Sequence, residues 1–188
     1  MSELFSIQLQ NRQQQGRDGV WLDLPTTTEQ VQAALRQIGI SSDNPQGLFI
    51  SGYFAEEEKR FAISYNMVLA SNVDELNFLA SRLETLSTGE RAELNAALQA
   101  PQSELFSIGR ITDFPENVDY YVHLPDVRGP AQLGDYYLNR SGMVDMPEEW
   151  KGGIDTAQFG RYVAQQEQGV FTEYGYLVKS GDVWQKVH

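Results

Sequence analysis

The sequence predicts an α+β fold organised as three small domains in a row. Apolar residues alternate near the start of the chain, leucines recur at helical spacing in the middle, and mixed helix and strand patterns return in the last third. We expect residues 1–70 to form an α+β domain, residues 71–126 an acidic helical domain, and residues 127–188 a second α+β domain. The length of 188 residues is itself compatible with one domain or with two or three small ones, because domains of about 50 to 70 residues can fold when they pack on neighbours.

The first domain is expected to begin with two strands and a helix. Apolar and polar residues alternate over residues 5–9 and again over residues 20–24, on either side of a Gln-rich loop. Thr26, with Glu29 three residues later, fits a capping box at the start of a helix. Gly39 is placed to end that helix, because glycine readily adopts the left-handed conformation that follows helix ends.

A β-hairpin is expected to complete this domain. Two further apolar runs cover residues 48–54 and residues 61–67. The intervening residues 55–60 are mostly charged, and so they predict a solvated hairpin tip.

The central domain is expected to be a helical hairpin. Leucines recur at helical spacing over residues 73–86, and Ser87 with Glu90 forms a second capping box before another apolar face. The hexapeptide SELFSI at residues 103–108 repeats residues 2–7 letter for letter. The first copy continues in strand alternation and the second in helical steps, so we interpret the repeat as a coincidence in two different environments.

The last third again mixes helices and strands. Residues 131–140 and residues 155–168 carry apolar side chains at helical spacing. Residues 170–172 and 176–178 then predict two strands around a Tyr-Gly turn. The chain therefore ends in a second α+β unit.

The charge of the chain limits its partners. It carries 26 acidic and 14 basic residues, which gives a formal net charge of −12. Direct binding to nucleic acid is not expected, because a phosphate-binding surface needs clustered lysines and arginines. There is no secretory signal and no apolar run long enough to cross a membrane, so we expect a soluble cytoplasmic protein that does not bind membranes.

Few residue types are available for catalysis or metal binding. The absence of cysteine excludes disulfides, thiolate zinc sites, iron–sulfur clusters and a cysteine nucleophile. His123 has Asp126 three residues later but no third ligand, and we interpret it as an ordinary, partly buried histidine. No catalytic residue, metal site or cofactor is predicted. Carboxylate pairs such as Asp74 with Glu75 are too common here to identify an acid/base site.

The acidic residues are unevenly distributed along the chain. The formal charge is −3 over residues 1–70, −7 over residues 71–126 and −2 over residues 127–188. Helix geometry brings residues three or four apart to neighbouring surface points, so Glu90 with Glu93 offers paired negative charges on a rigid element. The alternative is a solvated surface that only confers solubility.

Six stretches, in order along the chain, carry a family resemblance: VWLDLP at residues 20–25, VDELNFLA at 73–80, NVDYY at 117–121, QLGDYY at 132–137, DTAQFGRY at 155–162 and GVFTEYGY at 169–176. Together they resemble the ArdA family of antirestriction proteins, and they are spread over most of the chain, from residue 20 to residue 176. The most specific is the last pair, in which a helix containing Phe-Gly-Arg leads to Phe-Thr-Glu-Tyr-Gly-Tyr. Residues 98–102 and the segment beyond Lys179 depart from the family pattern.

This resemblance implies a function without catalysis. Proteins of this family mimic DNA and consist of three small domains, which pair through the third domain into an elongated, curved, acidic homodimer. The implied partner is a type I restriction-modification enzyme, whose methyltransferase core would hold the acidic dimer in its basic channel, so that restriction, and modification with it, is blocked. The candidate mimic carboxylates are Asp74, Glu75, Glu84, Glu90, Glu93, Glu104, Asp113, Glu116, Asp119 and Asp126.

An apolar cluster near the boundary between the second and third domains is the candidate dimer contact. It contains Tyr120, Tyr121, Val122, Leu133 and Tyr137. The alternative is that these side chains form ordinary domain core.

Two functions from other classes stay open. One is an adaptor that recognises a protein partner through acidic helices, and the other is a small hydrolase with a carboxylate dyad. The shortage of histidines and nucleophile motifs disfavours the hydrolase. A DNA mimic differs from both because it competes with duplex DNA and is displaced as ionic strength rises.

Overall fold

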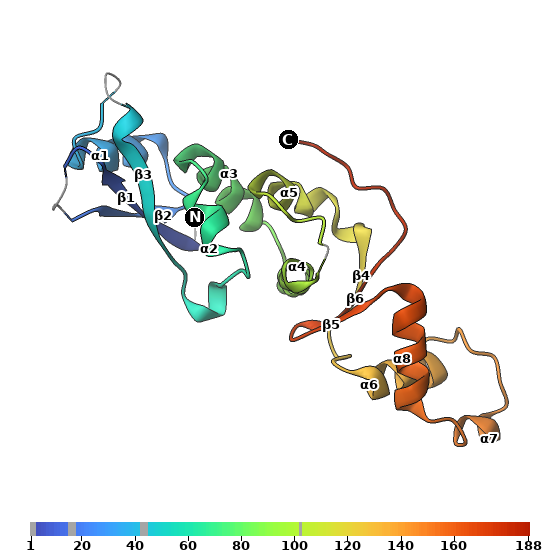
Figure 1. The fold of residues 1–188 in the computed structure, drawn as a ribbon. Coiled ribbons are helices and arrows are strands. Elements are labelled where there is room, and N and C mark those ends of the chain that lie inside the picture. The colour runs from blue at the N-terminus through green and yellow to red at the C-terminus, as the bar shows by residue number, and fades with distance from the viewer. Residues whose placement is uncertain (1–2, 15–17, 42–44, 102) are drawn as a thin grey trace. The chain divides into compact units, whose positions relative to one another are not determined.

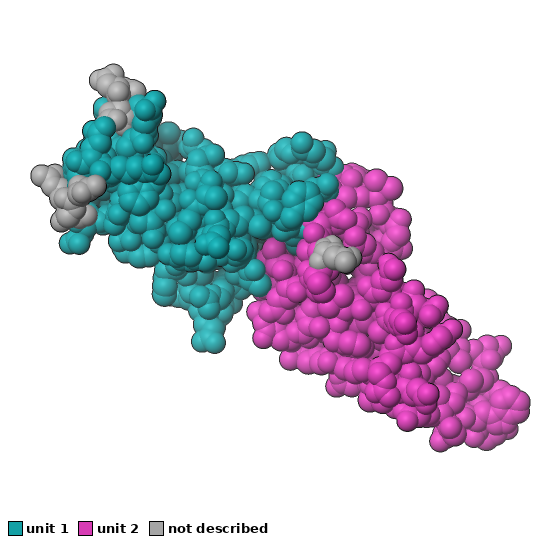
Figure 2. Space-filling view, in the orientation of Figure 1, with its two compact units in different colours: residues 1–87, 105–115, 186–188 teal, residues 88–104, 116–185 magenta. Residues whose placement is uncertain are grey.

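The computed structural model describes residues 3–14, 18–41, 45–101 and 103–188 (Figure 1). It is a mixed α+β structure with two three-stranded antiparallel sheets, which confirms the predicted fold class. The chain contacts define two compact units (Figure 2). Unit 1 contains residues 1–87, 105–115 and 186–188, and unit 2 contains residues 88–104 and 116–185. The arrangement as three domains stays a prediction.

The sheet of unit 1 contains both strands expected near the start of the chain. Its strand order is β2-β1-β3, with β1 at Phe5–Asn11, β2 at Val20–Leu24 and β3 at Leu48–Phe54. Every second side chain of β1 is buried, and Ile7 lies opposite Leu22 of β2. The alternating pattern therefore identified both the strands and their buried face.

The predicted hairpin between residues 48–54 and 61–67 is wrong. Strand β3 pairs with β1, and helix α2 at Tyr65–Leu69 begins inside the expected second strand. Phe61 and Ile63 are buried, so apolar residues of this run face the core of unit 1 although residues 61–64 form no strand. Alternation reports which side chains face a core, and a neighbouring strand is not needed for that burial.

Helix α1, at Thr28–Gln37, begins one residue later than the capping prediction implied. The capping box joins Thr27 to Gln30, whose side chain accepts from the Thr27 backbone amide at 3.3 Å. The backbone amide of Thr26 donates instead to Asn77 Oδ1 at 2.7 Å. Three consecutive threonines made the choice of cap ambiguous in the sequence, and this contact with a distant helix decides it.

The two central helices are present but belong to different units. Helix α3 at Val73–Leu83 packs in unit 1 with α5 at Ile108–Thr112, whereas α4 at Thr88–Gln99 belongs to unit 2. Their pairing as a hairpin therefore stays a prediction. The two SELFSI copies do adopt different structures, because Phe5 is buried in β1 and Phe106 is 68% exposed before α5.

The sheet of unit 2 has the strand order β4-β6-β5. Strands β5 at Val170–Thr172 and β6 at Gly175–Lys179 confirm the two strands predicted around the Tyr-Gly turn. Strand β4 at Tyr121–Leu124 was not predicted, and it pairs with β6 from Lys179 to Tyr176. The expected domain boundary after residue 126 thus falls inside one compact unit.

Two helices pack closely beside this sheet (Figure 1). Helix α6 at Pro130–Asp135 continues into a π-helical turn, η5, at Tyr136–Arg140, and α8 covers Thr156–Glu167. Both were expected as helices. Val127, Leu133 and Tyr176 form the buried centre of unit 2.

The remaining elements are short. They are α7 at Glu148–Lys151 and the 3₁₀ turns η1 at Pro45–Gly47, η2 at Glu57–Lys59, η3 at Phe114–Glu116 and η4 at Val118–Tyr120. Among the helices that the structure describes, none combines the length and apolar character that spanning a membrane requires.

Candidate functional site

The ten predicted mimic carboxylates are divided between the two units. Unit 1 holds Asp74, Glu75 and Glu84 on or next to α3, and Asp113 after α5. Unit 2 holds Glu90 and Glu93 on α4, followed by Glu104, Glu116, Asp119 and Asp126. They therefore do not all belong to one compact body.

Most of these carboxylates reach solvent. Four of them are exposed, namely Asp74, Glu116, Asp119 and Asp126. Five others are partly exposed, namely Glu75, Glu84 and Glu90, together with Glu93 and the paired Glu104. The four exposed carboxylates and Glu75, Glu84 and Glu90 make a set of seven. Except for Asp126, each of them lies on a helix or 3₁₀ turn or directly beside one, which fixes its main-chain position. This set is suited to contact a basic partner.

Glu93 differs from the other candidate carboxylate of α4 because one of its carboxylate oxygens is buried. Burial, together with the negative charges of Glu90 and Asp119, raises its pKa to about 8. Among the described residues, no group hydrogen-bonds its Oε1 atom. Glu93 therefore carries a proton at neutral pH much of the time and contributes less than a full negative charge.

Glu104 is neutralised by a cation from another element. Lys179 Nζ lies 2.9 Å from Glu104 Oε1, and the Tyr120 hydroxyl donates to the same oxygen at 3.3 Å. The hydrogen bond to Glu104 raises the pKa of Lys179, so the lysine stays charged. The Glu104 carboxylate therefore stabilises contacts within unit 2 and adds little to the negative charge of its surface.

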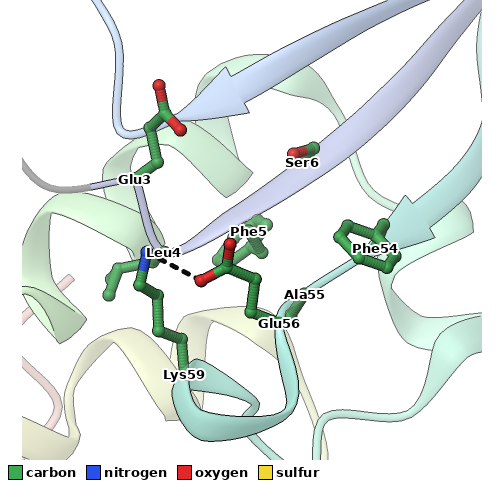
Figure 3. Close-up of a pocket in the computed structure, with 8 residues that line it drawn as sticks. All are labelled: Glu3, Leu4, Phe5, Ser6, Phe54, Ala55, Glu56 and Lys59. Carbon is green, nitrogen blue, oxygen red and sulfur yellow. Dashed lines mark ion pairs between the residues drawn. The ribbon is translucent and has the colours of Figure 1, made fainter.

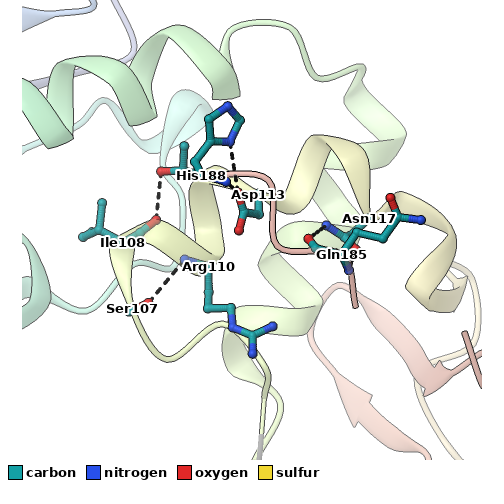
Figure 4. A network of polar contacts seen from close by, with 8 residues as sticks. Ser107, Ile108, Arg110, Asp113, Asn117, Gln185 and His188 are labelled. Atoms are coloured by element: carbon teal, nitrogen blue, oxygen red, sulfur yellow. Dashed lines mark hydrogen bonds and ion pairs between the residues drawn. The ribbon is translucent and has the colours of Figure 1, made fainter. Parts of the chain in front are cut away.

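Asp113 is buried in unit 1, with only 1% of its side chain exposed. Its Oδ1 atom accepts hydrogen bonds from the His188 backbone amide at 2.9 Å and from His188 Nδ1 at 3.0 Å (Figure 4). The His188 ring also packs edge-on against Phe78. In this state Asp113 cannot offer its charge to a partner.

A second polar contact visible in Figure 4 belongs to unit 2. The Asn117 side chain donates a hydrogen bond to the backbone carbonyl of Gln185 at 2.9 Å and accepts one from the backbone amide of Gln185 at 2.7 Å. Asn117 is itself buried, and so its side chain fixes the backbone of a residue far along the chain.

The acidic excess is concentrated in unit 2. This unit has 14 acidic and 6 basic residues, whereas unit 1 has 12 acidic and 8 basic residues. The formal charge is therefore −8 for unit 2 and −4 for unit 1. An even spread over the chain would have given the two units similar values.

The structure also exposes carboxylates that the sequence prediction left out. Glu57 and Glu58 in η2 and Glu149 in α7 are exposed. Their neighbours Glu56 and Glu148 are paired with Lys59 at 3.1 Å and with Lys151 at 2.9 Å. Adjacent acidic residues were visible in the sequence, but adjacency alone does not distinguish a binding surface from a solvated turn.

The predicted dimer residues have different surroundings. Tyr121 and Leu133 are buried inside unit 2, whereas Val122 is 46% exposed. Tyr120 packs edge-on against Trp184, and the Tyr137 hydroxyl donates to Glu167 Oε1. Burial raises the pKa of Tyr137, and the Glu167 carboxylate adds to this effect. Within one chain, Tyr121 and Leu133 therefore serve as core.

Both histidines and many carboxylates, which are metal-ligating residue types, lie in the described part of the chain. In the part of the chain that the structure describes, no three His, Cys, Asp or Glu residues are arranged to hold a metal ion. His123 is partly buried, and its Nε2 atom lies 2.8 Å from the Tyr174 carbonyl oxygen, as expected for a structural histidine.

A cavity of about 180 Å³ beside β1 is lined in part by Glu56 and Lys59, which form an ion pair with each other (Figure 3).

These features define an acidic α+β protein with exposed carboxylates, in which both histidines and the lysines Lys59, Lys151 and Lys179 make contacts within the chain. Comparison with protein families identifies it further. The family model of antirestriction protein (ArdA) matches residues 15–178 of the 188 residues, and the chain therefore belongs to this family. Comparison with curated proteins gives no match. Residues 179–188, which include Gln185 and His188, lie outside the matched region.

Proposed function

We propose that this protein is a DNA mimic, which binds the DNA-binding channel of type I restriction-modification enzymes and blocks restriction, and modification with it. It acts without catalysis, in the cytoplasm, and as a homodimer. Membership of the antirestriction family supports the biological role. The observation that carries the mechanism is the set of exposed carboxylates on and beside helical elements, together with the charge of −8 on unit 2.

The physical basis is substitution of carboxylates for phosphates. Contacts between a basic channel and DNA phosphates supply much of the affinity for DNA and carry no sequence information. Carboxylates fixed on a folded scaffold can occupy the same cationic groups. The contributing set is Asp74, Glu75, Glu84, Glu90, Glu116, Asp119 and Asp126, with Glu93 contributing more strongly as pH rises.

The amount of charge is adequate for this role. B-DNA carries one negative charge per about 1.7 Å of axis, or about two per base pair. The 26 acidic residues of one chain therefore match the gross charge of about 13 base pairs, and the net charge of −12 matches about 6. A homodimer doubles both values. Each exposed contact then contributes about 0.5 to 1 kcal/mol, so binding is spread over many side chains.

A restriction assay tests the proposal. The protein is added to a type I enzyme and its duplex substrate, and cleavage and methylation are followed together. We expect both reactions to stop at stoichiometric protein. Undiminished cleavage at a large excess of folded protein would reject the proposed function.

A further inference from the structure

Unit 1 has a groove at the end of β2. It has a volume of about 740 Å³ and lies between β2, the residues before α1 and the segment that precedes β1. Its lining side chains include Trp21, Asp23, Glu3 and Gln30. Among the described residues that line it, none is basic. The groove therefore combines an aromatic ring with two carboxylates and has no cation of its own.

Trp21 is placed on the open face of the sheet. It alternates with the buried Leu22 on β2 and is itself 49% exposed. Across the sheet, Trp21 lies opposite Gln8, and Gln8 lies opposite Gly52. A Cβ atom at Gly52 would stand 3.0 Å from Cη2 of Trp21, so the missing side chain leaves room for the indole ring over the sheet. This arrangement holds a large aromatic ring at the surface.

The carboxylates are placed on the same groove. Asp23 is exposed and follows Trp21 by two residues, so both side chains project from the same face of β2. Its Oδ1 atom accepts a hydrogen bond from Ser6 Oγ at 2.6 Å, which orients the carboxylate. Glu3 is exposed as well, and Figure 3 shows its carboxylate pointing away from Lys59. Lys59 is already paired with Glu56.

An indole ring beside carboxylates favours the binding of an arginine side chain. A guanidinium group stacks on aromatic faces, for which tryptophan is the best partner, and its planar donors match a carboxylate. We propose that the groove receives an arginine side chain of the bound partner, with the guanidinium held by the Trp21 ring and the carboxylates of Asp23 and Glu3. This inference rests on the proposed function, because a basic DNA channel supplies the arginine. The arginine in the groove would add one contact of defined orientation to the electrostatic attraction that is spread over many exposed carboxylates.

A titration of the isolated protein tests the groove directly. The probes are N-acetyl-arginine amide and N-acetyl-lysine amide at fixed ionic strength, and the readout is the indole N–H signals of Trp21, Trp150 and Trp184, assigned with single phenylalanine variants. We expect a saturable shift of the Trp21 signal that is larger with the arginine probe and is reduced by Asp23→Asn. A Trp21 signal that stays fixed, or moves no more than that of the exposed Trp150, would overturn the proposal.

Inhibition of a type I enzyme gives the second readout. We expect Trp21→Leu to raise the concentration for half-inhibition about fivefold and Asp23→Asn to raise it about threefold. The value for Trp21→Phe should lie between those of the wild type and Trp21→Leu, because phenylalanine keeps an aromatic face. The control Glu58→Gln removes another exposed charge, outside the groove, and should change the concentration for half-inhibition less than about twofold. Variants that are folded and inhibit like the wild type would reject the groove. If the wild type itself fails to inhibit, the proposed function is rejected, while the titration still decides whether the groove binds arginine.

Discussion

Gly160 of α8 lies directly against Pro130 of α6, because a Cβ atom at residue 160 would stand 1.8 Å from the Pro130 carbonyl oxygen. The same is true of Gly134, where a Cβ atom would stand 1.9 Å from the Thr156 carbonyl oxygen. The two helix backbones thus approach at positions that only glycine permits. This contact explains physically why Phe-Gly-Arg and Leu-Gly-Asp occur at these points of the sequence.

Gly160→Ala is therefore expected to destabilise unit 2 by about 3 kcal/mol or more, because backbone atoms cannot move aside as a flexible side chain can. Urea unfolding followed by circular dichroism measures the effect. Gly89→Ala in α4 is the matched control, since no atom lies within 4 Å of a Cβ atom there. The control should leave stability unchanged or raise it by up to about 1 kcal/mol. Equal stability of both variants would show that α6 and α8 are not in close contact.

Glu93→Gln is expected to stabilise the protein at neutral and alkaline pH. The pKa of Glu93 is about 8 in the folded state against an ordinary value of 4.5, so its charge opposes folding increasingly as pH rises through this interval. Below pH 4.5 the variant and the wild type should have similar stability. Above pH 8 the variant should be more stable by about 1 to 2 kcal/mol, a value reduced for solvent screening.

The measurement is the free energy of unfolding at several pH values, with Glu149→Gln as the exposed control. A gain for Glu93→Gln that does not change between pH 4 and pH 9 would contradict the assignment of Glu93 as a protonated carboxyl group.

His188→Ala is expected to weaken unit 1 by about 1 to 3 kcal/mol. The substitution removes the Nδ1 donor to the buried Asp113 carboxylate and the edge contact with Phe78. Hydrogen exchange at the amides of α5 should become faster in the variant. Val187→Ala, at a side chain that is 49% exposed, should leave this exchange unchanged. Identical protection of α5 in all three proteins would show that His188 does not anchor Asp113 in solution.

Charge neutralisation tests how the binding energy is distributed. Single variants such as Asp74→Asn, Glu116→Gln or Asp119→Asn should alter inhibition less than about threefold, since exposed ion pairs contribute little individually. Removing six of the exposed carboxylates together should weaken inhibition by more than about a hundredfold. Loss of all inhibition in a single folded variant would mean that one contact dominates and that distributed mimicry is incorrect.

Local sequence patterns predicted the elements better than their partners. The strands and helices around residues 5–9, 20–24 and 155–168 follow from alternation, helical spacing and caps. The hairpin after β3 was wrong because Phe61 and Ile63 face the core without a strand partner. Strand β4 was missed because four residues are too few to establish a period, and only pairing with β6 defines it.

The exposure of the candidate carboxylates was harder to predict for the same reason. Asp113 is covered by His188, which lies 75 residues later, and Glu104 is paired with Lys179 at the same separation. Neither contact leaves a local trace in the sequence. Of the other candidate carboxylates, Asp74 on α3, Glu116 in η3 and Asp119 in η4 are exposed.

Competition with DNA tests the central claim most directly. A labelled duplex is bound to a type I methyltransferase and titrated with the protein at several salt concentrations. DNA mimicry predicts complete displacement of the duplex, with an affinity of the protein for the enzyme that falls steeply as salt rises. A ternary complex that retains the DNA, or an affinity that salt does not change, would contradict it.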